Sequence, residues 1–206
     1  MTSASNLREK SAMLRRGLIT LAQGIICQFN QQPYVAMRVG IVIKGHNHIP
    51  WISTYASNFE INLIGNAAQL TTGNAGDYGN AFRHTLWQAI ITSLFGEIEA
   101  RRIGYAHEDG ITYNTKIRIF KNEEFADCIA DLLNNEIGRQ IGLDNIGASN
   151  NAMAEKVLNY YKDKGLWVTE KLSNGQYVVK KVFLTQEQYN AALEKLKCLH
   201  NNGLEN

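Results

Sequence analysis

The sequence predicts a mainly α protein, a helical bundle with a small C-terminal β-hairpin, from three observations. Apolar residues recur at three- and four-residue steps along most of the chain, as they do on one face of an amphipathic helix. Near the C-terminus, the pair Asn174-Gly175 separates two apolar runs, which is a strong hairpin signal. Of the 206 residues, 45% are hydrophobic and 19% are charged, so the chain can form a sizeable core.

The N-terminal segment, residues 1–55, is predicted to hold a basic helix and an apolar run that pack on the main domain, residues 56–206. One apolar stripe runs along this helix, formed by Leu14, Leu18, Leu21, Ile25 and Phe29. Residues 1–48 contain six basic groups and one acid, a net charge of +5. We interpret these charges as a solvated helix face, the alternative being contact with phosphate or with an acidic partner. The run from Tyr34 to Ile43 is compatible with either a strand or a buried helix.

The central segment is predicted to form two helices before Gly96, the first over about Ser57–Leu70. Asp77 is suited to cap the second. Two opposite faces of this second helix are apolar, one with Phe82, Leu86, Ile90 and Leu94, the other with Trp87, Ile91 and Phe95. A helix that is apolar on two sides is expected in the middle of a bundle. After Gly96, a helical pattern resumes over Glu97–Glu108.

The C-terminal half is predicted to contain three more helices. Asn122 caps the first, and Gly142 is expected to stop it. The second covers about Asn151–Lys164, and the last begins after a capping box from Thr185 to Gln188. The hairpin lies between these two helices.

Composition excludes several classes of protein. The three cysteines, Cys27, Cys128 and Cys198, stand far apart and form neither a disulfide framework nor a zinc knuckle. We interpret Cys27 and Cys128 as core thiols, because their neighbours are apolar. No apolar run approaches the length of a membrane-spanning helix. The net charge of +2 does not indicate a nucleic-acid-binding protein, although it does not exclude one.

Polar residues occur at regular spacing on three successive helical segments. Asn80, His84 and Gln88 are four residues apart and share a face of one helix. His107 and Glu108 end the next segment. The third segment carries Asp131, Asn135 and Arg139, again four residues apart. Because burying such groups without partners is costly, we expect them to contact one another or a ligand.

Two imidazoles and a carboxylate suggest a divalent metal ion, with His84, His107 and Asp131 as its ligands. A bound metal lowers the pKa of water and supplies hydroxide at neutral pH. In such a site Glu108 would accept the proton of that water or orient the water. Asn135 and Arg139 would hold an anionic substrate or a developing oxyanion. The catalytic set is then His84, Glu108, Asn135 and Arg139.

Two alternatives remain open from the residues alone. The same cluster could be a metal-free acid–base or binding site, or a buried network in which His84 pairs with Asp131 beside Trp87. The other histidine pair, His46 and His48, is assigned to a surface turn.

Three strings in this chain resemble a known family pattern: DYGNAFRHTLWQAI, AHE, and ADLLNNEIGRQIG. They are similar to a poorly characterised domain at the C-termini of bacterial polymorphic toxins, effectors and wall-associated secreted proteins. The resemblance covers about residues 75–195. This chain has Leu133 where that family often has a polar residue. Positions shared with the pattern are Asp77, Asn80, Arg83, His84, Trp87, His107, Glu108, Asp131, Asn134, Asn135 and Arg139.

The resemblance implies a delivered toxin or effector, and with the polar cluster it favours a hydrolase acting on a phosphodiester, a lipid or cell-wall material. A protein of this kind would be made in the bacterial cytoplasm and exported without a classical signal peptide. Its partners would be an immunity protein or a delivery machinery. The alternative is a non-catalytic docking module of a larger assembly, whose polar network is structural.

Overall fold

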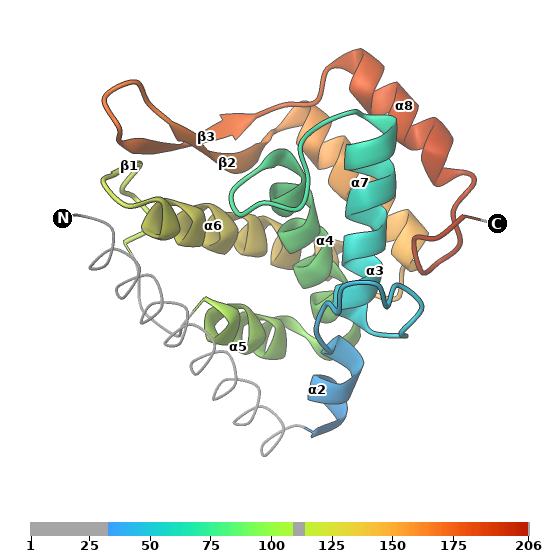
Figure 1. Ribbon diagram of the computed structural model, residues 1–206. Helices are drawn as coiled ribbons and strands as arrows, with labels where there is room; N and C mark the ends of the chain where they lie inside the picture. Colours follow the sequence, from blue (N-terminus) through green and yellow to red (C-terminus); the bar gives the residue numbers. More distant parts are fainter. Residues whose placement is uncertain (1–32, 109–113, 206) are drawn as a thin grey trace.

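The computed structural model of the protein describes residues 33–108 and 114–205 (Figure 1). Its helices are α2 (Pro33–Val39), α3 (Ile52–Phe59), α4 (Tyr78–Phe95), α5 (Glu97–His107), α6 (Glu123–Asp144), α7 (Asn150–Asp163) and α8 (Gln186–Leu196). A π-helical segment, η1 (Glu60–Ala67), continues α3. The strands are β1 (Ile119–Phe120), β2 (Leu166–Lys171) and β3 (Tyr177–Val182). The fold is therefore the mainly α bundle with a C-terminal hairpin that the sequence predicts. The basic helix predicted before residue 30 lies outside the described residues.

Helix α4 runs through the middle of the bundle, with α6 on one side and α3 and α7 on the other (Figure 1). The predicted cap is confirmed, because the Asp77 side chain accepts a hydrogen bond from the backbone N–H of Asn80. Both predicted apolar faces pack into the core; at the end of the helix, Phe95 is partly buried and Leu94 is half exposed. His84 lies on this central helix and is buried.

Two glycines bring the backbones of α4 and α6 into direct contact. A Cβ atom at Gly138 would lie 2.2 Å from the carbonyl oxygen of Thr85, and one at Gly142 would lie 2.5 Å from that of Ala89. The prediction that Gly142 stops the helix is wrong, because α6 continues to Asp144. Gly142 allows close packing instead of ending the helix. The glycine contact fixes the spacing between the two helices that carry His84 and Asp131.

A three-stranded antiparallel sheet, ordered β1-β3-β2, covers one side of α6 (Figure 1). The predicted hairpin is confirmed, with Leu166 paired to Val182 and Lys171 paired to Tyr177 across β2 and β3. The buried side chain of Asn134 on α6 donates to the Trp167 carbonyl at 2.8 Å and accepts from the Trp167 N–H at 3.0 Å. Further along β2, the Thr169 N–H donates to the Gly76 carbonyl. These bonds attach the sheet to the helices of the site.

The region before α4 differs most from the predictions. The helix predicted over Ser57–Leu70 begins earlier, at Ile52, and changes to π-helical geometry at Glu60. The buried Glu60 carboxylate accepts from Arg83 at 2.9 Å and from the Gly73 N–H at 3.1 Å, so it anchors the loop before α4. Of the ambiguous run from Tyr34 to Ile43, the part up to Val39 belongs to helix α2, and the rest is neither helix nor strand. Val35 and Val39 of this helix belong to the same core cluster as α4.

The remaining local signals agree with the structure. Asn122 caps α6 through the N–H of Glu124, and Thr185 and Gln188 form the predicted capping box of α8. Across residues 33–108 and 114–205, we find no helix with the length and apolar character needed to cross a membrane.

Candidate functional site

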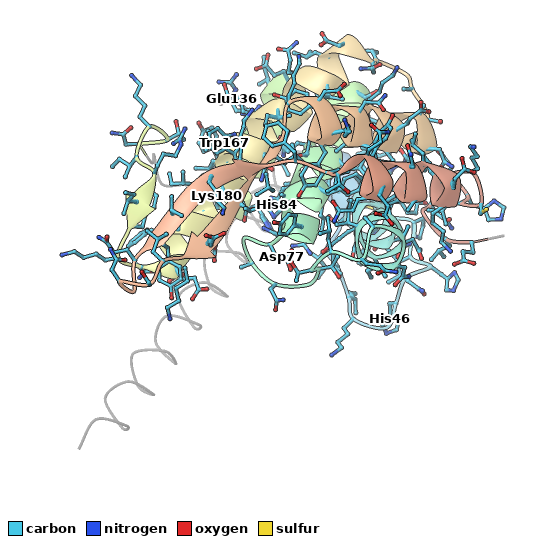
Figure 2. All side chains as sticks on the ribbon, turned by 90° about the horizontal axis from the view of Figure 1, so that it is seen from above. His46, Asp77, His84, Glu136, Trp167 and Lys180 are labelled. Atoms are coloured by element: carbon cyan, nitrogen blue, oxygen red, sulfur yellow. The ribbon has the colours of Figure 1, made fainter. Side chains whose placement is uncertain are left out.

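Polar residues of α4, α5 and α6 converge around His84. Figure 2 shows His84 inside the molecule. On one side of the ring, His84 Nδ1 lies 3.7 Å from Glu108 Oε1 and 3.3 Å from Asn135 Oδ1. On the other side, His84 Nε2 lies 3.6 Å from Asp131 Oδ2. The predicted convergence of these segments is therefore confirmed, with His84 at the centre.

Three residues of this cluster form a group that could hold a metal ion: His84, His107 and Glu108. Each offers one ligand atom, and these atoms all lie within 4.8 Å of one another. His84 and Glu108 are buried, whereas His107 keeps an exposed surface. Solvent therefore approaches the group from the side of His107, at the C-terminal end of α5.

Asp131 takes a position different from the one expected for a metal ligand. Within the described residues, the group comprises Glu108 instead of Asp131. Asp131 faces the opposite ring nitrogen of His84 and accepts a 2.6 Å hydrogen bond from Asn80 Nδ2 on its other oxygen. A carboxylate behind a ligating imidazole fixes the tautomer and the orientation of the ring. Asp131 is placed to do this for His84.

Aromatic contacts hold the two imidazoles together. The ring centroids of His84 and His107 are 5.4 Å apart, and the Trp87 ring lies 5.3 Å from His107 and 6.1 Å from His84. Trp87 is in turn fixed by a hydrogen bond from its indole N–H to Ser53 Oγ, at 3.0 Å. The Trp of the recognised string thus positions both histidines.

Both histidines are uncharged at neutral pH. The pKa of His84 lies well below its usual value, mainly because the ring is buried and to a smaller extent because His107 and Arg83 lie nearby. Although His107 keeps some exposed surface, desolvation of its ring beside His84 and Trp87, together with the charge of Arg83, lowers the pKa of His107 to about 4. Neutral imidazole is the form that ligates a metal, so no proton has to be removed from either ring when an ion binds near pH 7.

The pKa of Asp131 shifts upward, in the direction opposite to the pKa shifts of the two histidines. Burial, and next the nearby charge of Glu108, raise the pKa of Asp131 well above its usual value, while Arg83 lowers it in part. Arg83 also bonds to the side-chain oxygen of Asn80, the residue that donates to Asp131. The negative charge of Glu108 thus disfavours the charged form of Asp131 across the His84 ring.

Asn135 and Arg139, predicted to act together on an anion, lie in different surroundings. Asn135 contacts His84, whereas Arg139, one turn farther along α6, donates to Gln88 Oε1 at 3.3 Å. The Nδ2 atom of Asn135 and the Nε2 atom of Gln88 are buried without a hydrogen-bond partner in the described part of the chain. Both atoms face Gly104, where a Cβ would lie 3.0 Å from Gln88 Nε2.

Cys128 is a residue of the site that the sequence interpretation missed. Its apolar neighbours suggested a core thiol, but its Sγ donates to Glu108 Oε2 at 3.3 Å and the residue is only partly buried. The available signal was spacing, because Cys128 precedes Asp131 by three residues and Asn135 by seven. By contrast, His46 and His48 lie in an exposed turn as predicted, and Figure 2 shows His46 at the edge of the molecule, away from His84.

Asp127, one turn before Asp131, provides a test of the electrostatics. Its pKa is raised from 3.8 to about 6, mainly by burial. Because the folded state binds this proton more tightly, stability is greatest below about pH 4 and is lost as the pH rises through 6. Asp127→Asn is therefore expected to stabilise the protein at about pH 8 by up to about 3 kcal/mol. Urea unfolding at several pH values measures this gain, and an equal gain at acid pH would contradict the assignment to ionisation.

Comparison with known proteins shows that this chain matches a protein-family model. A family model described as a domain of unknown function (DUF6973) matches residues 46–165, more than half of the chain. The matched segment includes His84, His107, Glu108 and Asp131. No curated protein and no solved structure matches the chain.

Proposed function

The chain belongs to the family described as domain of unknown function DUF6973, and from that premise we propose that it is a metal-dependent hydrolase of the toxin or effector kind. The observation that carries the proposal is the group of His84, His107 and Glu108, whose ligand atoms lie within 4.8 Å of one another. Two neutral imidazoles and one carboxylate are a ligand set of zinc hydrolases, and three protein ligands leave a position for water.

Each residue has a part in this proposal. His84, His107 and Glu108 would hold the ion, which when bound would supply a hydroxide at neutral pH. With an ion on Nδ1 of His84, the ring proton would lie on Nε2, which faces Asp131 Oδ2 at 3.6 Å. Asn135, which contacts His84 through its oxygen, has an unpartnered Nδ2 for a substrate oxygen. Arg139 supports this face through Gln88.

The toxin or effector assignment rests on the resemblance of the three sequence strings. A protein of this kind is made in the bacterial cytoplasm, is exported without a classical signal peptide, and is matched by an immunity protein or a delivery machinery. Its substrate is a phosphodiester, a lipid or cell-wall material. These classes lie in different compartments, so the compartment in which the protein acts separates them.

Expression inside a bacterial host, directed separately to cytosol and periplasm, tests this function. The wild type is expected to stop growth in the compartment that holds its substrate, and His84→Ala is expected to abolish the effect because the central ligand is lost. The matched control is His46→Ala, an exposed histidine outside the site. Elemental analysis of the purified proteins is expected to find a metal ion in the wild type and in His46→Ala only. Normal growth in both compartments, with metal-free protein, would refute the proposal.

A second candidate is a non-catalytic docking module with a structural polar network. The burial of the site favours this docking module, because the side chains of His84 and Glu108 are only 6% and 8% exposed. In this case chelators and added divalent ions would leave the melting temperature unchanged. His84→Ala would then lower that temperature without any loss of metal.

A further inference from the structure

Cationic and aromatic side chains alternate where the end of helix α7 meets the sheet. Cζ of Arg118 lies 4.5 Å from the centre of the Trp167 ring, and Lys181 Nζ lies 5.4 Å from the same centre. Lys181 Nζ is also 5.8 Å from the centre of the Tyr160 ring, and Lys164 Nζ is 5.4 Å from it. The order is cation, ring, cation, ring, cation, and we call these five residues the cationic ladder. Lys164 is exposed, and the other four are half-buried.

Strand pairing and helical spacing build the ladder. Trp167 and Lys181 are partners across β2 and β3, so their side chains lie on the same face of the sheet. Tyr160 and Lys164 are four residues apart at the end of α7, which places them on one side of the helix. Lys181 Nζ donates to the Lys164 carbonyl at 2.9 Å and so ties the strand to the end of the helix. The contacts with the rings hold the cations in place, so the cations lose less freedom when a ligand binds.

The positive charges of the ladder have no carboxylate partners. In the described part of the chain, none of its three cations forms an ion pair with an acidic residue. By contrast Lys180, the residue before Lys181, pairs with Glu170. Burial and, to a smaller extent, the charge of Lys164 lower the pKa of Lys181. An anionic ligand would therefore meet positive charges that repel one another and that no neighbouring acid neutralises.

Helix α6 connects the ladder to the candidate site. The Asn134 side chain bonds to both the N–H and the C=O of Trp167. The next residue, Asn135, contacts His84. A ligand that lies along the ladder is therefore held against a strand that is fixed to the same helix as Asn135 and Asp131.

We propose that the cationic ladder binds the phosphate backbone of a single-stranded nucleic acid. The inference rests on the proposed hydrolase and deepens it, because it selects nucleic acid among the proposed substrates. Guanidinium and ammonium groups bind phosphate oxygens, and a strand carries a phosphate in every nucleotide. A row of cations with interleaved aromatic rings is typical of surfaces that bind single strands without regard to sequence. The small net charge of +2 does not oppose this, because distant surface charges are screened beyond about 8 Å at physiological salt.

Binding of a fluorescein-labelled oligothymidine of about twelve nucleotides tests the proposal. Fluorescence anisotropy of the strand is followed as the full chain is added at several salt concentrations, with EDTA present so that no metal-dependent cleavage occurs. Three phosphate contacts contribute about −2 to the slope of log affinity against log salt concentration. The combined variant Arg118→Gln, Lys164→Gln and Lys181→Gln is expected to lose this contribution and to bind at least about tenfold more weakly. Lys181→Gln alone is expected to change the slope by about 0.7.

The matched control is Lys180→Gln, which removes the same charge from the next residue, on the opposite face of the strand, and is expected to bind like the wild type. Circular dichroism checks that each variant is folded, and Arg118→Gln serves as a second single variant. No binding by the wild type, or equal salt slopes in the wild type and the combined variant, would overturn the inference. Equal losses in Lys180→Gln and Lys181→Gln would overturn it too.

Competition separates the other classes of ligand. Unlabelled oligothymidine is expected to displace the labelled strand at a lower concentration than oligoglutamate or vesicles that contain phosphatidylserine. The reverse order would overturn the inference in favour of an acidic protein or a membrane surface. Because these assays need neither a metal ion nor cleavage, a negative result here leaves the metal site standing, and failure of the growth test leaves this result unaffected.

Discussion

Gly138→Ala is expected to destabilise the protein by about 3–5 kcal/mol, a large effect for the addition of one methyl group. The new Cβ would lie 2.2 Å from the Thr85 carbonyl oxygen, so helices α4 and α6 would have to move apart. Backbone atoms cannot rotate away as a flexible side chain can. Because α4 and α6 carry His84 and Asp131, the same variant is expected to lengthen the contact between these two residues. Urea unfolding followed by circular dichroism measures the loss.

Gly104→Ala is the matched control, since it also places an alanine in a helix of the same site. Its Cβ would meet the end of the Gln88 side chain at 3.0 Å, not a backbone atom. The higher helix propensity of alanine contributes about 1 kcal/mol in the opposite direction. We therefore expect a change of about 1 kcal/mol or less. Equal losses in the two variants would show that the close approach of α4 and α6 is not what makes Gly138 necessary.

The second large effect is expected in metal affinity, where two carboxylate variants separate the roles of Glu108 and Asp131. Glu108→Gln removes a ligand and is expected to weaken zinc binding more than about 100-fold, whereas Asp131→Asn removes only the partner of His84 and is expected to cost about 10–100-fold. Both variants should stay folded without metal. In particular, the raised pKa of Asp131 shows that its buried site disfavours the charged form, so a neutral amide is tolerated there.

Competition with a zinc-binding dye gives the two affinities, and melting curves of the metal-free proteins give the stabilities. If Asp131→Asn weakened binding more than Glu108→Gln, Asp131 would be the ligand that the sequence pattern predicts. A loss of stability in Asp131→Asn, in protein that binds no metal, would instead support the structural network.

Local signals explain why the fold was predictable from the sequence. The caps at Asp77 and Thr185 and the Asn174-Gly175 turn each act within a few residues, and the structure forms all of them. Gly142 was misinterpreted because glycine both ends helices and allows close helix packing. Only the position of the Ala89 carbonyl on another helix distinguishes the two.

The site was predictable in its residues but not in their arrangement. Four-residue spacing placed His84 on a polar face of one helix and Asp131 and Asn135 on a polar face of another, and the structure brings them together. Spacing along a helix does not tell which ring nitrogen of His84 meets which carboxylate, because that depends on how three helices cross. For the same reason, the contact of Cys128 with Glu108, two elements apart, could not be inferred from its apolar neighbours.

The bonds from Asn134 to Trp167 also bear on how the protein avoids aggregation. Strand β2 ends the sheet on one side, and an exposed edge strand offers its unpaired N–H and C=O groups to strands of other molecules. Here the Asn134 side chain occupies both groups of Trp167, and the Gly76 carbonyl occupies the N–H of Thr169. These are groups that an added strand would need. Of the two neighbouring asparagines, Asn134 thus protects a sheet edge, while Asn135 contacts the histidine at the centre of the site.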